Sequence, residues 1–138
     1  MSTVIRPEVS KRNPYYINKH RYYELKHFCM QYPDWIHAVN AMDGIKVSSV
    51  RNDISNKSYV ESLVEEVVIE RDTLISKIHL IETVAQDAAD DLSIYILKGV
   101  TEGLSFEVLQ ARYRIPCCKD TYYILYRKFF WLLDRTRK

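Results

Sequence analysis

A short run of cationic and hydrogen-bonding side chains near the C-terminus has the chemistry of a surface that contacts nucleic acid. Lys119 suits the acceptor atoms of guanine or a phosphate, and Asp120 suits the amino group of cytosine. Arg127 and Lys128 follow one or two turns later, where we expect contacts with phosphates. The expected DNA-contacting set consists of these residues and neighbours of similar chemistry: Lys119, Asp120, Thr121, Tyr123, Arg127, Lys128, Arg114, Arg135, Arg137 and Lys138.

Two helices are needed to position this set, and the sequence marks the ends of both. The first is expected to follow Gly103, start near Ser105 and cover residues 106–113, with Phe106, Leu109 and Tyr113 at helical spacing. Pro116 prevents its continuation, because proline lacks an amide hydrogen and restricts the residue before it.

The second helix is expected to begin near Cys118, with Asp120 in a first turn that favours a carboxylate. Its apolar residues fall on one stripe: Tyr122, Leu125, Phe129, Leu132 and Leu133. The cations lie off that stripe, so this pair of helices predicts a helix-turn-helix whose second helix enters the major groove. A solvated cationic helix face is the alternative that the same pattern allows.

The predicted turn is longer than that of a classical helix-turn-helix and carries an arginine where glycine is common. Arg114 and Ile115 occupy the turn, and Pro116 and Cys117 lengthen it by about two residues. A left-handed backbone at Arg114 would be strained, because only glycine adopts it freely.

Net charge divides the chain into three parts, although the whole chain carries only +2. Residues 1–57 hold nine Lys/Arg against five Asp/Glu, residues 58–97 two against nine, and residues 98–138 nine against four. The net charges are therefore +4, −7 and +5, an arrangement that lets the ends contact a polyanion. Alternatively, the basic ends neutralise the acidic middle by packing against it.

The N-terminal part predicts a basic flexible arm over residues 1–17 and a helical segment with a loop over residues 18–57. Asn18 suits the cap of a helix over residues 19–32, with Tyr22, Leu25, Phe28 and Cys29 on one face. Pro33 ends that helix, and a short helix holding Trp35 follows it. Residues 41–57 are rich in turn formers and predict a loop between helices.

Residues 58–97 predict a central helical segment, whose longest helix starts at Ser58, with a break near Asp90. Its apolar residues follow a heptad for about four repeats, and Arg71 is the polar interruption. Such a stripe packs either inside its own domain or against a second copy of the chain, and the sequence leaves both open. The dimerisation residues expected in the second case are Val64, Val67, Leu74, Ile78 and Ile81.

Several classes of protein are disfavoured by composition and motifs. No apolar run approaches the length of a membrane span, and the odd number of cysteines, three, favours a reduced compartment, so we expect a cytoplasmic protein. His20, His27, Cys29 and His37 match no zinc-ligand spacing, and no phosphate-binding glycine loop or nucleophile motif occurs. We expect no metal, no cofactor and no enzymatic activity.

Two segments resemble small transcriptional regulators of phages and prophages, the ArpU and RinA late-gene activators and related sigma-like proteins. They are residues 13–35, NPYYINKHRYYELKHFCMQYPDW, and residues 95–138, which begin YILKGVTEGLSFEVLQARYRIPCCKDTYYILYRK. The resemblance implies an all-α fold with N-terminal helices, a long central helix and a C-terminal helix-turn-helix over residues 98–138 that resembles sigma region 4. It also implies control of late or packaging genes in the host cell, with host RNA polymerase as a possible partner.

The sequence thus predicts an all-α, sequence-specific binder of double-stranded DNA that acts as a homodimer or beside RNA polymerase. Two alternatives stay open. In the first, the helix-turn-helix scaffold serves as a protein-interaction module, an inhibitor or adaptor of host machinery, because a fold does not determine function. The other alternative is a small terminase-like DNA packaging protein, which would assemble into a ring.

Overall fold

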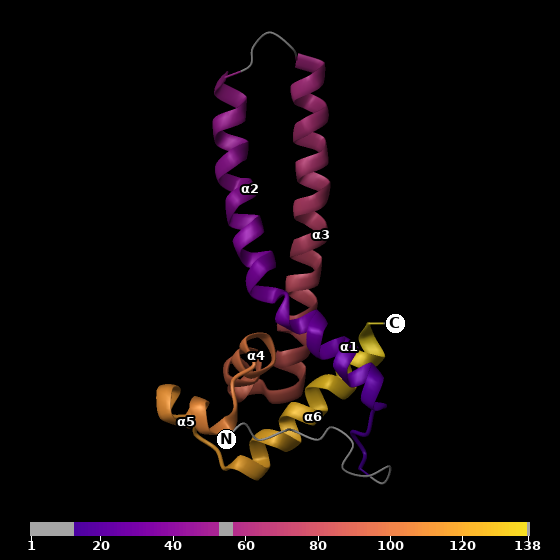
Figure 1. The fold of residues 1–138 in the computed structure, drawn as a ribbon, viewed down its shortest axis with the longest axis vertical. Helices are drawn as coiled ribbons and strands as arrows, with labels where there is room; N and C mark the ends of the chain where they lie inside the picture. Colours follow the sequence, from indigo (N-terminus) through magenta and orange to yellow (C-terminus); the bar gives the residue numbers. More distant parts are fainter. Residues whose placement is uncertain (1–12, 53–56, 138) are drawn as a thin grey trace. The chain divides into compact units, whose positions relative to one another are not determined.

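Every regular element in the computed structural model is helical, over the residues that it describes. It describes the backbone of residues 13–52 and 57–137, with side chains for 13–43 and 61–137. The elements, in chain order (Figure 1), are α1 (Lys19–Met30), α2 (Tyr32–Asn52), α3 (Lys57–Ala89), the 3₁₀ turn η1 (Asp90–Leu92), α4 (Ser93–Glu102), α5 (Phe106–Tyr113) and α6 (Lys119–Thr136). The prediction of an all-α fold is confirmed. No helix in this part of the chain has both the length and the apolar character needed to cross a membrane.

The chain divides into two compact units that differ from the segments expected from sequence. Residues 1–31 and 80–138 belong to one unit, and residues 32–79 to the other. The expected boundaries followed changes in charge and pattern along the chain. The first unit instead joins α1 to α4 and α6, which are distant in sequence. The hydrophobic periodicity of a sequence does not show which distant helices pack together.

Helix α1 forms as the sequence predicts. The side-chain oxygen of Asn18 accepts a hydrogen bond from the His20 amide at 2.9 Å, which satisfies one of the unpaired donors of the first turn. The predicted face is buried: Tyr22, Leu25, Phe28 and Cys29. This face packs on α4 and α6, where Tyr22 meets Phe130 edge to face with ring centres 5.0 Å apart.

The last turns of α3 and helix α4 complete the first unit around the predicted break. Ile81 and Ala85 are buried on α3, and the helix gives way to η1 where Asp90 takes a left-handed φ of 45°. Helix α4 follows and ends at Gly103, whose φ of 69° suits a glycine C-cap. The expected break near Asp90 is confirmed.

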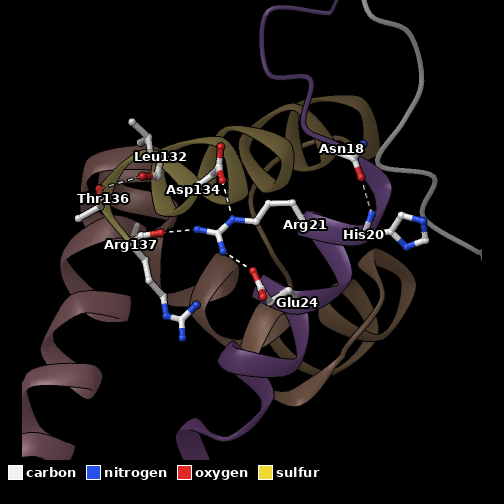
Figure 2. Close-up of polar contacts among 8 residues, drawn as sticks. All are labelled: Asn18, His20, Arg21, Glu24, Leu132, Asp134, Thr136 and Arg137. Atoms are coloured by element: carbon white, nitrogen blue, oxygen red, sulfur yellow. Dashed lines mark hydrogen bonds and ion pairs between the residues drawn. The ribbon is translucent and has the colours of Figure 1, made fainter.

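Arg21 ties α1 to the end of α6. Its Nε donates to Asp134 at 2.7 Å, and its terminal nitrogens donate to Glu24 and to the backbone carbonyl of Arg137 (Figure 2). The hydrogen bonds that Arg21 donates to Asp134 and Glu24 raise the pKa of its guanidinium, the one to Asp134 most strongly. Because the Arg137 carbonyl lies beyond the last helical turn, the bond also caps the C-terminal end of α6.

The residues just before α1 are packed, so the expectation of a flexible arm over 1–17 fails for its last part. Ile17 is buried, and the Tyr15 ring meets Trp131 of α6 edge to face at 5.6 Å between centres. The Asn13 side chain accepts a hydrogen bond from the Tyr15 amide at 2.9 Å, which fixes a local turn. The contact between the Tyr15 and Trp131 rings holds these residues against α6, and hydrophobic periodicity does not reveal such a contact. Residues 1–12 lie outside the described part of the chain.

The second unit is a pair of antiparallel helices, α2 and residues 57–79 of α3 (Figure 1). The expected loop over 41–57 is wrong for residues 41–52, which continue α2. Turn propensity is a weak local signal, and the helix continues through these residues in spite of it. Residues 53–56 lie outside the described residues.

The heptad stripe of α3 faces α2 of the same chain at its polar position. Arg71 donates from Nε to Asp43 at 2.7 Å, so the interruption in the stripe has an internal partner. Two turns on, the Lys77 ammonium lies 5.6 Å from the centre of the buried Trp35 ring. Arg71 and Lys77 therefore each contact α2 within their own unit.

The expected dimerisation residues divide into two groups. Ile78 and Ile81 are buried within the single chain, so their assignment to an interface between copies is corrected. Val64, Val67 and Leu74 are partly exposed. A homodimer through these three residues stays a prediction.

Candidate nucleic-acid interface

Helices α5 and α6 stand where the sequence predicts them, joined by residues 114–118. The Ser105 hydroxyl accepts from the Val108 amide at 3.4 Å and caps α5. Arg114 ends α5 with φ 52° and ψ 51°, the left-handed conformation expected to strain a non-glycine residue. Its amide donates to the Gln110 carbonyl at 3.1 Å, which satisfies part of the helix end. Cys118 is the N-cap residue of α6.

The side of α6 that faces the core is more aromatic than the predicted stripe. Its buried residues are Tyr122, Tyr123, Tyr126, Phe129, Phe130 and Leu133. Leu125 and Leu132, expected in the core, are only partly buried, as is Trp131. On α5, Phe106 and Leu109 are buried as expected, but Tyr113 is 39% exposed and its ring faces the Lys98 ammonium at 4.6 Å.

Tyr123 belongs to the core, which corrects its assignment as a DNA-contacting residue. It is 9% exposed, and its hydroxyl accepts from the Phe106 amide at 3.4 Å. That amide lies in the first turn of α5, which has no helical acceptor of its own. Tyr123 therefore positions α5 against α6.

The opposite side of α6 is exposed in its first turns and half-buried further along. Asp120 and Thr121 are exposed near its N-terminus, and Ile124 is 51% exposed one turn later. Lys128, half-buried, continues the same face. These four residues form what we call the α6 outer face, which combines polar and cationic groups with one apolar side chain.

Lys119 is exposed but already paired. Its ammonium lies 2.8 Å from the Glu107 carboxylate of α5, which raises the pKa of Lys119 and lowers that of Glu107. Both partners are exposed, and such pairs contribute little stability because water and salt screen them. A contact between Lys119 and DNA therefore requires exchange of this ion pair.

The cations at the end of α6 lie on aromatic rings. The Arg135 guanidinium is 4.0 Å from the centre of the Trp131 ring and stays exposed. Arg137 lies 4.0 Å from the Phe28 ring and is half-buried, so it contributes to packing between α6 and α1. Lys138 falls outside the described residues.

Arg127 has a buried donor with no partner. Its Nε atom is inaccessible and makes no hydrogen bond to any described residue, although part of the side chain is exposed. The side chain also lines an open groove of about 350 Å³ together with Asn13, Pro14, Tyr15 and Ile124. Sequence reasoning found Arg127 from its charge but missed the groove, because only the fold brings residues 13–15 to α6.

The three cysteines have different environments, which predicts different reaction rates. Cys118 is exposed, and its Sγ lies 3.2 Å from the Thr121 hydroxyl; that hydrogen bond is the main reason for its lowered pKa. Burial raises the pKa of Cys117 and, far more, that of Cys29. The thiolate is the nucleophile, so iodoacetamide near neutral pH is expected to label Cys118 first and Cys29 last.

Peptide mass spectrometry over a time course measures these rates. The unfolded chain is the control, in which the three cysteines are expected to react at similar rates. Labelling of Cys29 in the native protein as fast as Cys118 would contradict the packing of α1.

Neither the metal-binding side chains of the described residues nor similarity to known proteins identifies a ligand of this interface. The described residues contain no group of three or more His, Cys, Asp or Glu side chains arranged to hold a metal ion. Comparisons with models of protein families, with curated proteins and with solved structures found no match.

Proposed function

We propose that the chain binds double-stranded DNA, with the α6 outer face in the major groove, and regulates transcription in a sequence-specific way. The observation that carries the proposal is the division of α6 into a buried aromatic side and an outer side with exposed Asp120 and Thr121 and half-buried Lys128. An exposed helix in this arrangement suits a groove that admits one α-helix.

The charge around α6 supports a polyanionic partner. Residues 105–137 contain seven Lys/Arg and three Asp/Glu. Two of those carboxylates already have a cationic partner in the protein: Glu107 pairs with Lys119, and Asp134 pairs with Arg21 of α1. Arg112 and Arg114 at the end of α5 are exposed and add positive charge beside the connection. The role in late or packaging genes rests on the resemblance to phage regulators alone.

Two substitutions separate base contacts from phosphate contacts. Thr121→Ala is expected to weaken preference for a selected duplex about tenfold at one base position, with little effect on random DNA. Lys128→Gln is expected to weaken binding to all duplexes similarly and to reduce the salt dependence by about one ion. Fluorescence anisotropy with labelled duplexes at several salt concentrations measures both.

Lys26→Gln on α1 is the matched control, because it removes one positive charge from a helix other than α6. We expect it to change affinity less than about twofold. Equal losses for Lys26→Gln and Lys128→Gln would remove the assignment of the outer face.

A second candidate function is a protein-interaction module. It is favoured by Ile124, whose side chain is 51% exposed in the middle of the outer face. Recovery of a stoichiometric protein partner from host lysate, lost on Ile124→Ser and accompanied by no DNA binding, would support this candidate against the first.

A further inference from the structure

We propose that the groove between residues 13–15 and α6 is a binding site for one sugar–phosphate unit of the DNA backbone, with Arg127 holding the phosphate. The proposal rests on the proposed DNA binding and adds a second point of contact, beside the helix that reads the bases. We call this site the Arg127 groove, lined by Asn13, Pro14, Tyr15, Ile124 and Arg127.

The electrostatics of the groove suit a single anion. Among the described residues, its lining contains one cation, Arg127, and no carboxylate. The buried Nε of Arg127 is a hydrogen-bond donor without a partner in the described protein, and an unpaired buried donor is costly. A phosphate oxygen is a strong acceptor for a guanidinium and binds it in a fork geometry. A small adjustment of the side chain on binding would satisfy this donor.

Part of Arg127 lies beside the core. It lines a small, partly open pocket of about 10 Å³ with Ile17, Tyr22, Tyr126 and Phe130, so its inner part has buried aromatic and aliphatic neighbours. A side chain restrained by such neighbours loses less conformational entropy on binding an anion than a free one.

The rest of the groove suits the sugar more than a second charge. Pro14, Tyr15 and Ile124 supply apolar surface, and the Tyr15 ring is fixed by its edge-to-face contact with Trp131. A deoxyribose ring presents carbon atoms on its faces and joins directly to the phosphate. A sugar–phosphate unit therefore matches an apolar wall beside one cation better than a free inorganic anion does.

The groove also adjoins the outer face of α6. Ile124 belongs to both surfaces, and Arg127 follows it by less than one turn. A helix lying in the major groove has backbone phosphates along its flank. A duplex read by the outer face would therefore present a phosphate to Arg127.

Two pairs of variants test this site in the full chain by anisotropy with duplex DNA. Arg127→Gln is expected to reduce affinity for all duplexes about tenfold and to lower the salt slope by about one, whereas Lys26→Gln changes neither. Tyr15→Ala is expected to weaken binding about fivefold with an unchanged salt slope, because it removes apolar contact and no charge, and Tyr15→Phe is expected to bind like wild type. Thermal unfolding of each variant verifies that the fold is retained.

The outcomes separate this inference from the proposed function. If Arg127→Gln binds DNA with the same affinity and the same salt slope as the wild-type chain, the groove assignment is overturned and DNA binding by α6 is left intact. Absence of DNA binding by the wild-type chain would overturn both. Inorganic phosphate alone is also titrated to millimolar concentration, with Trp131 fluorescence as the signal. Saturation that Arg127→Gln abolishes and Tyr15→Ala does not would contradict the sugar–phosphate assignment.

Discussion

Replacing Gly99 with alanine is expected to lower the free energy of unfolding by about 2 kcal/mol. A Cβ atom at Gly99 of α4 would collide with the hydroxyl of Tyr122 of α6, a side chain that is fully buried. Overpacking of this kind costs about 3 kcal/mol, and the better helix propensity of alanine returns about 1 kcal/mol. Urea unfolding followed by circular dichroism measures the difference.

The same collision predicts a specific rescue. Tyr122→Phe removes the hydroxyl, which has no hydrogen-bond partner in the described residues, so this variant alone is expected to be as stable as wild type or more so. In its background, the nearest atom to the new Cβ at position 99 is the ring Cζ at 3.3 Å, a tight contact that small shifts accommodate. Gly99→Ala with Tyr122→Phe is therefore expected to unfold near the wild-type urea midpoint.

Gly103→Ala is the matched control. Its cost comes from a φ of 69°, and its Cβ would meet only Met30 Cε at 3.6 Å. We expect a loss of about 1 kcal/mol that Tyr122→Phe leaves unchanged. A loss for Gly99→Ala that Tyr122→Phe does not reduce would contradict the packing of α4 on α6.

The buried tyrosines predict a steep loss of stability at alkaline pH. Burial raises the pKa of Tyr22, Tyr122 and Tyr126, and Tyr22 and Tyr126 share a hydrogen bond of 2.8 Å between their hydroxyls. The unfolded chain releases these protons near pH 10 and the folded chain only at higher pH. Their contribution is therefore complete below about pH 10 and falls above it, by up to about 1.4 kcal/mol per pH unit for each tyrosine.

Urea unfolding at a series of pH values measures this slope, and tyrosinate absorbance follows the ionisation. Buried Cys29, whose pKa is also raised, is expected to add to the slope from about pH 9. Tyr122→Phe is expected to reduce the slope by about 1.4 kcal/mol per pH unit. Tyr23→Phe, which removes an exposed hydroxyl, is the control. Full ionisation of the tyrosines near pH 10 in a protein that remains folded would contradict the buried cluster.

Most helix ends follow from local chemistry that the sequence displays. Asn18, Gly103, Ser105 and Pro116 act within a few residues of their own position, and the helices begin or end beside them. The error over residues 41–52 comes from residue types alone. That stretch contains glycine, serine and asparagine, yet it continues α2, because turn propensity is a weak signal where no proline or cap marks a helix end.

The candidate interface was predictable in its location but less so in its individual residues. Helical spacing places Lys128 and Thr121 outside, but it misplaced Tyr123, because six large side chains make the buried face of α6 wider than one stripe. Neither the Lys119–Glu107 pair nor the Arg127 groove has a local signal, since each joins two segments that only the fold brings together.

Binding of the wild-type chain to duplex DNA tests the central proposal most directly. A duplex selected from a random pool and a scrambled duplex of the same length are compared by anisotropy across a series of salt concentrations. We expect affinity for both to fall as salt rises, and the selected duplex to bind about a thousandfold more tightly than the scrambled one. Failure of selection to enrich any sequence, with no salt-dependent binding to either duplex, would contradict DNA recognition by α6.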